Sequence, residues 1–101
     1  MTLKRIALAV CVLSASQMSV AADIEAGKQA SQACMACHGA AGVSNNEIWP
    51  NLAGQKAGYL AKQMRDFKAG KRTDPAMSAM ANAIADDQID NIAAYYASLK
   101  P

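Results

Sequence analysis

The last part of the chain has its clearest helical pattern. Apolar residues recur there at intervals of three and four positions: Ile89, Ile92, Ala93, Tyr96 and Leu99. Such spacing places them on one face of an amphipathic helix. The adjacent residues Tyr95 and Tyr96 cannot both lie on that face. The pattern predicts that Tyr96 points into the core and that Tyr95 lies at the surface.

Two further helices are predicted in the middle of the chain. Residues 59–69 have an apolar face made of Leu60, Met64 and Phe67, and Gly70 follows as a C-cap. Pro75 suits the first turn of a short helix that continues to Ile84. No segment has a strand pattern of comparable strength, so the sequence predicts an all-α domain.

The first predicted helix of this domain covers residues 24–36. The segment is rich in helix-forming residues, and Asp23 before it is a candidate N-cap. Between Gly39 and Gly58 the chain is rich in glycine, asparagine, serine and proline, which is typical of an irregular loop.

Residues 1–22 have the features of a secretory signal peptide. Two basic residues precede an eight-residue apolar run, Ile6–Leu13, and Val20-Ala21-Ala22 supplies small residues before a cleavage site. A helix that spans a bilayer needs roughly 20 apolar residues. We therefore expect export, cleavage before Asp23, no stable membrane insertion after removal of the signal, and one domain over residues 23–101.

Removal of the signal changes the charge of the protein. The whole chain has 10 Lys+Arg against 8 Asp+Glu, a formal net charge of +2. The excess comes from Lys4 and Arg5, so the exported chain is formally neutral and lacks the basic character of a nucleic-acid-binding protein. A domain of this size, rich in alanine, buries little apolar surface. It commonly needs a disulfide, a metal or another stabilising group.

The segment Cys34-Met35-Ala36-Cys37-His38 can provide such a stabilising group. Two cysteines at this spacing occur in disulfides, in redox-active dithiols and in zinc sites, but none of these explains His38. Zinc would need two more ligands, and residues 23–101 contain no other cysteine or histidine. In an exported helical chain, C-x-x-C-H predicts one covalently attached haem c, with both cysteines bonded to it and His38 as an axial ligand of the iron.

The second axial ligand decides between electron transfer and chemistry at an open iron. His38 is the only histidine, so a second histidine is excluded within one chain. Met35 lies inside the motif on the side of His38, and Met64 belongs to an apolar helix face. Met77 and Met80 remain. They are three residues apart, on nearly one helical face, so periodicity does not choose between them.

Further segments match a known pattern: Cys34–Gly39, Pro50–Gln55, Tyr59–Arg72 and Asp86–Ala97. With these segments the chain resembles the class I monohaem cytochromes c, and among them the bacterial groups c-four, c-five and c-five-five-three. The resemblance implies a small cytochrome c fold wrapped around one haem. One departure is Ala85, where many relatives have a serine N-cap, and we expect Asp86 to cap the last helix instead.

The resemblance also implies roles for individual residues. In similar proteins the axial methionine is the first of a Met-x-x-apolar pair, which favours Met77 as the ligand, with Met80 as the alternative. Pro50 would lie near His38 and offer its carbonyl to the free ring nitrogen. The residues expected to line the haem are Pro50, Leu52, Tyr59, Leu60 and Phe67.

The function implied by the resemblance is periplasmic one-electron transfer, without enzymatic activity. The partners would be a redox-protein donor and acceptor that dock transiently. One alternative is a haem-based ligand sensor or peroxidase-like enzyme with an opened sixth iron position. Another is a haem-free protein in which Cys34 and Cys37 form a disulfide or exchange thiols.

Overall fold

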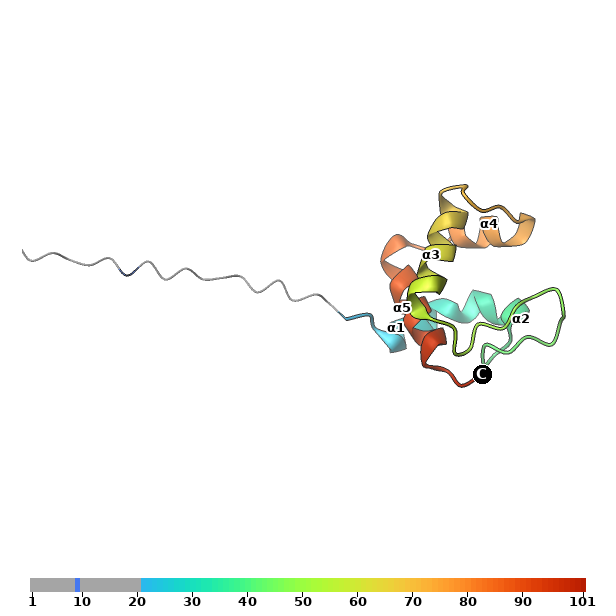
Figure 1. The fold of residues 1–101 in the computed structure, drawn as a ribbon, viewed down its shortest axis with the longest axis horizontal. Coiled ribbons are helices and arrows are strands. Elements are labelled where there is room, and N and C mark those ends of the chain that lie inside the picture. The colour runs from blue at the N-terminus through green and yellow to red at the C-terminus, as the bar shows by residue number, and fades with distance from the viewer. Residues whose placement is uncertain (1–8, 10–20) are drawn as a thin grey trace, which may run out of the picture.

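The computed structural model describes Ala9 and residues 21–101, so the predicted signal peptide lies almost entirely outside the described residues. The described chain is helical and contains no strand, as the sequence predicts (Figure 1). Its elements in chain order are α1 (Ile24–Ala30), the 3₁₀ turn η1 (Ser31–Cys34), α2 (Met35–His38), α3 (Ala57–Lys68), α4 (Pro75–Asn82) and α5 (Asp86–Ser98). Within the described part of the chain, no helix is long and apolar enough to cross a bilayer.

The first helical segment is interrupted, so the prediction of one continuous helix over residues 24–36 is wrong. α1 ends at Ala30, η1 follows as a tighter turn, and α2 continues to His38. At the interruption, the Ser31 hydroxyl donates a hydrogen bond to the carbonyl of Lys28 at 2.8 Å. Such local bonds from side chain to backbone compete with regular helical bonding.

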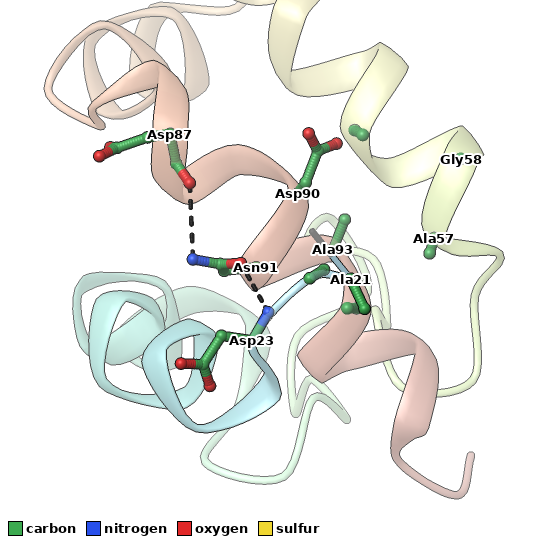
Figure 2. Close-up of a pocket in the computed structure, with 11 residues that line it drawn as sticks. Ala21, Asp23, Ala57, Gly58, Asp87, Asp90, Asn91 and Ala93 are labelled. Carbon is green, nitrogen blue, oxygen red and sulfur yellow. Dashed lines mark hydrogen bonds between the residues drawn. The ribbon is translucent and has the colours of Figure 1, made fainter. Parts of the chain in front are cut away.

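The start of α1 is fixed by two hydrogen bonds of Asp23. Its carboxylate accepts from the backbone N–H of Ala26 at 3.1 Å, so Asp23 is the N-cap that the sequence predicts. Its own backbone nitrogen donates to Oδ1 of Asn91 in α5 at 2.8 Å (Figure 2). The first residue of the expected exported domain is therefore tied to the last helix.

α1 and α5 approach each other closely at Gly27. A Cβ atom at this position would lie 1.9 Å from the backbone oxygen of Asn91, so the contact requires glycine. α5 also packs against α3, and α3 packs against α4. The last helix therefore has a neighbour on two of its sides.

The apolar core lies along α5. Ile89, Ile92, Ala93 and Tyr96 are buried, which confirms the predicted apolar face. Tyr95 is also buried, with 6% of its surface exposed, so the prediction that it lies at the surface is wrong. Because α1 and α3 both cover α5, its buried arc is wider than one apolar stripe. The rings of Tyr95 and Tyr96 pack against each other with centroids 5.2 Å apart.

The two middle helices follow the sequence prediction closely. α3 begins two residues before the predicted range 59–69, and Gly70 follows it with φ at +74°. α4 begins at Pro75, as expected. The carboxylate of Asp74 caps this helix and accepts from the backbone N–H of Met77 at 2.8 Å.

The loop between α2 and α3 folds back on itself and reaches α5. The carbonyl of Gly42 accepts hydrogen bonds from the backbone nitrogens of Leu52 at 2.8 Å and Ala53 at 2.9 Å. The backbone nitrogen of Gly54 donates to the carbonyl of Tyr96 at 3.0 Å. The loop therefore has fixed ends although it lacks regular structure.

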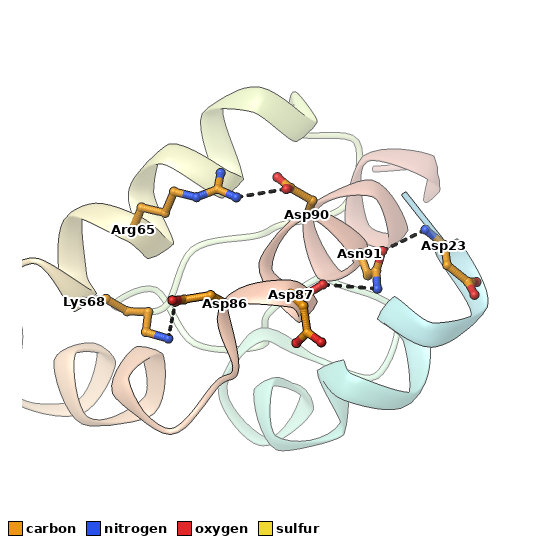
Figure 3. Close-up of polar contacts among 7 residues, drawn as sticks. All are labelled: Asp23, Arg65, Lys68, Asp86, Asp87, Asp90 and Asn91. Atoms are coloured by element: carbon orange, nitrogen blue, oxygen red, sulfur yellow. Dashed lines mark hydrogen bonds and ion pairs between the residues drawn. The ribbon is translucent and has the colours of Figure 1, made fainter. Parts of the chain in front are cut away.

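Two ion pairs join α3 to α5 (Figure 3). The guanidinium of Arg65 lies 2.9 Å from the Asp90 carboxylate, and the ammonium of Lys68 lies 2.7 Å from the Asp86 carboxylate. The expectation that Asp86 caps α5 is wrong, because Ala85 is the N-cap residue and makes no side-chain cap bond. The carboxylate of Asp86 accepts a hydrogen bond from Lys68 instead. This bond and the positive charge of Lys68 lower the pKa of Asp86.

Replacing Gly27 by alanine tests the crossing of α1 and α5. The added methyl group overlaps the backbone of Asn91, so the free energy of unfolding of the haem-loaded protein should fall by about 1–3 kcal/mol in guanidinium denaturation. Gly58→Ala is the matched control, because a Cβ atom there meets nothing within 4 Å. This control should be neutral or stabilising by up to about 1 kcal/mol. Equal losses in the two variants would contradict the close crossing.

Replacing Asp86 by asparagine tests the ion pair with Lys68. Because folding lowers the pKa of Asp86, the pair stabilises the protein above the ordinary carboxyl pKa, and this contribution is lost as pH falls through the lowered value. The difference in unfolding free energy between wild type and Asp86→Asn should therefore shrink as pH falls below about 4. Asp87→Asn is the control, since Asp87 belongs to none of the ion pairs found among residues 21–101. The same pH profile in both variants argues against a role for the pair.

Candidate functional site

The cysteines and the histidine of the C-x-x-C-H motif lie on consecutive helical turns. Cys34 ends η1 and is buried, Cys37 lies half-buried on α2, and His38 ends α2 with 6% of its surface exposed. The thiols of Cys34 and Cys37 are free, so this structure does not contain the disulfide considered as an alternative.

The chain leaves α2 through a turn that requires glycine. Gly39 has φ at +87°, and a Cβ atom there would lie 2.0 Å from the carbonyl oxygen of Val43. This turn directs the following loop back toward the end of α2. The turn thereby brings the residue that follows His38 by twelve positions into contact with the His38 ring.

That residue is Pro50, whose carbonyl oxygen lies 2.7 Å from Nδ1 of His38. A carbonyl oxygen only accepts hydrogen bonds, so Nδ1 carries the proton and Nε2 keeps a free lone pair. This is the tautomer that a metal ligand needs, and the bond also fixes the plane of the ring. The contact implied by the resemblance is present in the structure, and the residues of the motif fit a covalently attached haem.

The two thiols differ in their surroundings. Burial raises the pKa of the Cys34 thiol, the neighbouring Tyr96 hydroxyl opposes this effect, and the charge of Cys37 adds to it. The thiol of Cys34 is therefore protonated at neutral pH. Tyr96, which belongs to the same buried cluster as Cys34, comes from α5, far away in the sequence.

The two candidate methionine ligands lie on the same helix. Met77 is in the first turn of α4, Met80 is in the second, and both are half-buried. In Figure 1, α4 and the segment containing α2 project to the same side of α3. Burial is similar at the two positions, so the preference for Met77 still rests on the family pattern.

The residues expected to line the haem lie in different environments. Leu60 is buried in the apolar cluster that contains Cys34, and Leu52 packs against that cluster. Phe67 is buried outside it, with the guanidinium of Arg72 4.6 Å from the centroid of its ring. Tyr59 is 49% exposed, and the side chain of Pro50 is also exposed.

A separate cavity of about 550 Å³ lies where the start of α1 meets α3 and α5 (Figure 2). Its polar lining comes from Asp23, Asp87, Asp90 and Asn91, and alanines supply most of the remainder. None of the motif residues or candidate iron ligands lines it. The cavity is therefore distinct from the predicted haem site.

The sequence does not reveal one polar group beside the motif. The helical pattern predicts that the ring of Tyr96 faces inward, but it does not identify the neighbours of the hydroxyl group. The crossing of α1 and α5 places that hydroxyl beside Ser31 and Cys34. Because these contacts depend on the packing angle of two helices distant in sequence, no local signal predicts them.

Comparison with known families decides the assignment. A family model described as cytochrome c matches residues 24–100. The chain belongs to the cytochrome c family. This family binds haem c covalently for electron transport, and the segment from Cys34 to His38 fits the C-x-x-C-H motif of such attachment.

Curated relatives of this cytochrome c chain include longer proteins. Cytochrome c4 from Pseudomonas aeruginosa is 46% identical over 80 residues, which cover 79% of this chain and 40% of that protein. A protein from Thiomonas intermedia named thiosulfate dehydrogenase electron acceptor is 40% identical over 95 residues, covering 93% of this chain and 44% of that protein. The chain thus spans less than half the length of these relatives.

A solved structure supports the same fold for this cytochrome c. Reduced recombinant cytochrome c4 from Pseudomonas stutzeri matches it with a TM-score of 0.74 and 39% identity. The match covers 79% of this chain and 47% of that chain. The five helices and the 3₁₀ turn found within residues 21–101 therefore form a cytochrome c fold.

Proposed function

We propose that this chain is an exported one-electron carrier in which Cys34 and Cys37 hold a single haem c, with His38 and Met77 as the axial ligands. The observation that carries the proposal is the hydrogen bond between His38 Nδ1 and the Pro50 carbonyl, which leaves Nε2 free to bind a metal. When bound, the haem supplies reversible one-electron exchange at its iron.

The residues of the motif hold the haem and orient its histidine ligand. Cys34 and Cys37 would hold the cofactor through two covalent bonds from adjacent helical turns, and His38 presents a ring whose rotation is restricted by Pro50. The Pro50 carbonyl also makes the imidazole a stronger electron donor. The soft thioether of Met77 favours the reduced state relative to a second histidine. With side chains at both axial positions, small molecules would be kept from the metal.

The cap of α4 supports Met77 as an ordered ligand. Asp74 accepts hydrogen bonds from the backbone nitrogens of Ala76 at 3.0 Å and Met77 at 2.8 Å. Pro75 fixes the backbone of the same turn. The backbone at Met77 is thus held on the N-terminal side by a cap, which limits the entropy lost when its side chain is fixed.

We also propose that residues 1–22 are an export signal and that the mature domain covers residues 23–101 in the periplasm. Two observations support cleavage before Asp23: Asp23 is the N-cap of α1, and its backbone nitrogen bonds to Asn91. After cleavage this nitrogen becomes the terminal ammonium. Asp87 and Asp90 line the same cavity and provide negative charge beside it.

The partners that we propose are redox proteins that dock transiently, one as donor and one as acceptor. The relative named thiosulfate dehydrogenase electron acceptor supports an oxidoreductase as the class of donor. A role as a carrier and not as an enzyme would follow if side chains fill both axial positions, as proposed above.

Replacing each candidate methionine in turn tests the axial ligation. The oxidised wild type should have the weak far-red absorption band of sulfur-to-iron ligation. Met77→Ala should abolish this band and lower the reduction potential, because the soft thioether is removed. Met80→Ala is the matched control on the same helix and should retain the band.

Three outcomes separate the alternatives for this site. Loss of the band only in Met80→Ala would make Met80 the ligand. Absence of the band in the wild type, with ready binding of small ligands, would support the sensor or peroxidase-like function. Mass spectrometry of the peptide that contains Cys34 and Cys37 tests attachment itself, since a haem-free peptide with a disulfide would overturn the proposal.

One measurement tests the proposed mature N-terminus, and one substitution tests its contact with α5. Mass spectrometry of the exported wild-type protein should show Asp23 as its first residue. Asn91→Ala removes the acceptor for the Asp23 nitrogen, so the unfolding free energy should fall by about 1 kcal/mol. Asn82→Ala, which removes a bond within α4, is the control and should have the smaller effect. A first residue well before Asp23 would refute the cleavage site.

A further inference from the structure

The hydroxyl group of Tyr96 is a buried polar atom without a partner. Tyr96 is 1% exposed, and its hydroxyl is the one buried side-chain N or O atom without a hydrogen bond in the described part of the chain. Tyrosine hydroxyls usually have a partner when they are buried, because loss of water without a replacement bond is unfavourable. The groups that surround this hydroxyl are therefore the place to look for an acceptor.

Two polar groups of η1 lie near this hydroxyl: the hydroxyl of Ser31 and the sulfur of Cys34. Ser31 is completely buried and already uses its hydrogen in the bond to the Lys28 carbonyl at 2.8 Å. Its oxygen can therefore only accept. Burial raises the pKa of Tyr96, with the charge of Cys34 adding to the effect, so the phenol stays protonated and remains a donor.

Attachment of haem changes the chemistry of the other neighbour. The thiol of Cys34 adds across a vinyl double bond, so its sulfur bonds to one carbon and its hydrogen goes to the other. The product is a thioether, which has no S–H donor and acts only as a weak acceptor. Among the hydroxyls of Tyr96 and Ser31 and this sulfur, the phenol is then the single free donor.

We propose that Tyr96 is a positioning residue of the haem site, whose hydroxyl donates a hydrogen bond to the sulfur of Cys34 once that sulfur carries the haem. This inference rests on the proposed attachment at Cys34. The positive end of the O–H dipole faces the attachment point. Since oxidation adds positive charge at the iron, the hydroxyl favours the reduced state and raises the reduction potential.

Proton NMR of the reduced, haem-loaded wild type tests the bond directly. A buried, bonded hydroxyl should give a slowly exchanging proton with nuclear Overhauser effects to the β-protons of Cys34. Such effects to Ser31 alone would overturn the proposal, as would exchange too fast for the proton to be seen. This measurement requires no variant, so it holds even where a substitution prevents folding.

The reduction potential provides the second readout. Tyr96→Phe removes only the hydroxyl and should shift the potential to a lower value. Tyr95→Phe is the matched control, since Tyr95 is buried on the same helix with its ring 5.2 Å from that of Tyr96, and it should leave the potential unchanged. Ser31→Ala should retain the wild-type potential.

Each other result counts against the bond. An unchanged potential in Tyr96→Phe, an equal shift in Tyr95→Phe, or the same shift in Ser31→Ala would assign the hydroxyl a structural role only. Mass spectrometry of the Cys34 peptide is run on the same samples. Haem on this peptide without the NMR contact refutes only the role of Tyr96, whereas a haem-free peptide refutes the proposed attachment.

Discussion

The close crossing of α1 and α5 at Gly27 is the contact on which the rest of the domain depends. The backbone of Asn91 occupies the space that a side chain at Gly27 would need. Because α1 leads directly through η1 into α2, the position of α1 on α5 also determines where Cys34 lies relative to Tyr96. A small core with many alanines tolerates little separation of these helices. If α1 and α5 move apart, both lose packing contacts, and the core has few large side chains that could fill the gap.

A second constraint connects the loop after the C-x-x-C-H motif to the crossing of α1 and α5. Pro50 holds His38 only because the chain turns sharply at Gly39, and the same loop ends in the bond from Gly54 to the carbonyl of Tyr96. The two ends of the loop are thus fixed on α2 and on α5. Orientation of the histidine ring is therefore a property of the whole fold and not of the C-x-x-C-H motif alone.

The sequence predicts the parts of this structure that depend on local patterns. The apolar face of α5, the start of α4 at Pro75 and the capping by Asp23 all follow from residues close together in the chain. The motif is equally local, because its chemistry depends on the spacing of three residues. Met77 and Met80 are not separated by periodicity, since a spacing of three places both on one helix face.

Two of the incorrect predictions concern contacts between distant segments, and the third concerns a local break in a helix. Tyr95 is buried because α5 is covered from two sides, which an amphipathic pattern in one helix does not indicate. Asp86 bonds to Lys68 of α3 in place of capping its own helix. The bond of Ser31 accompanies the break in the first helix, and the pattern of helix-forming residues around it does not show this break.

The buried polar side chains of the described domain gather around the motif, and this distribution is itself informative. Ser31 and His38 are the two buried polar residues, and each bonds to a backbone carbonyl. The Tyr96 hydroxyl lies beside the same turns without such a bond. A core this small gains nothing from burying a hydroxyl that has no partner, because the lost hydration is unfavourable. A tyrosine there is best explained by an acceptor that forms only when the haem is attached, and the proposed thioether sulfur of Cys34 is such an acceptor beside the hydroxyl.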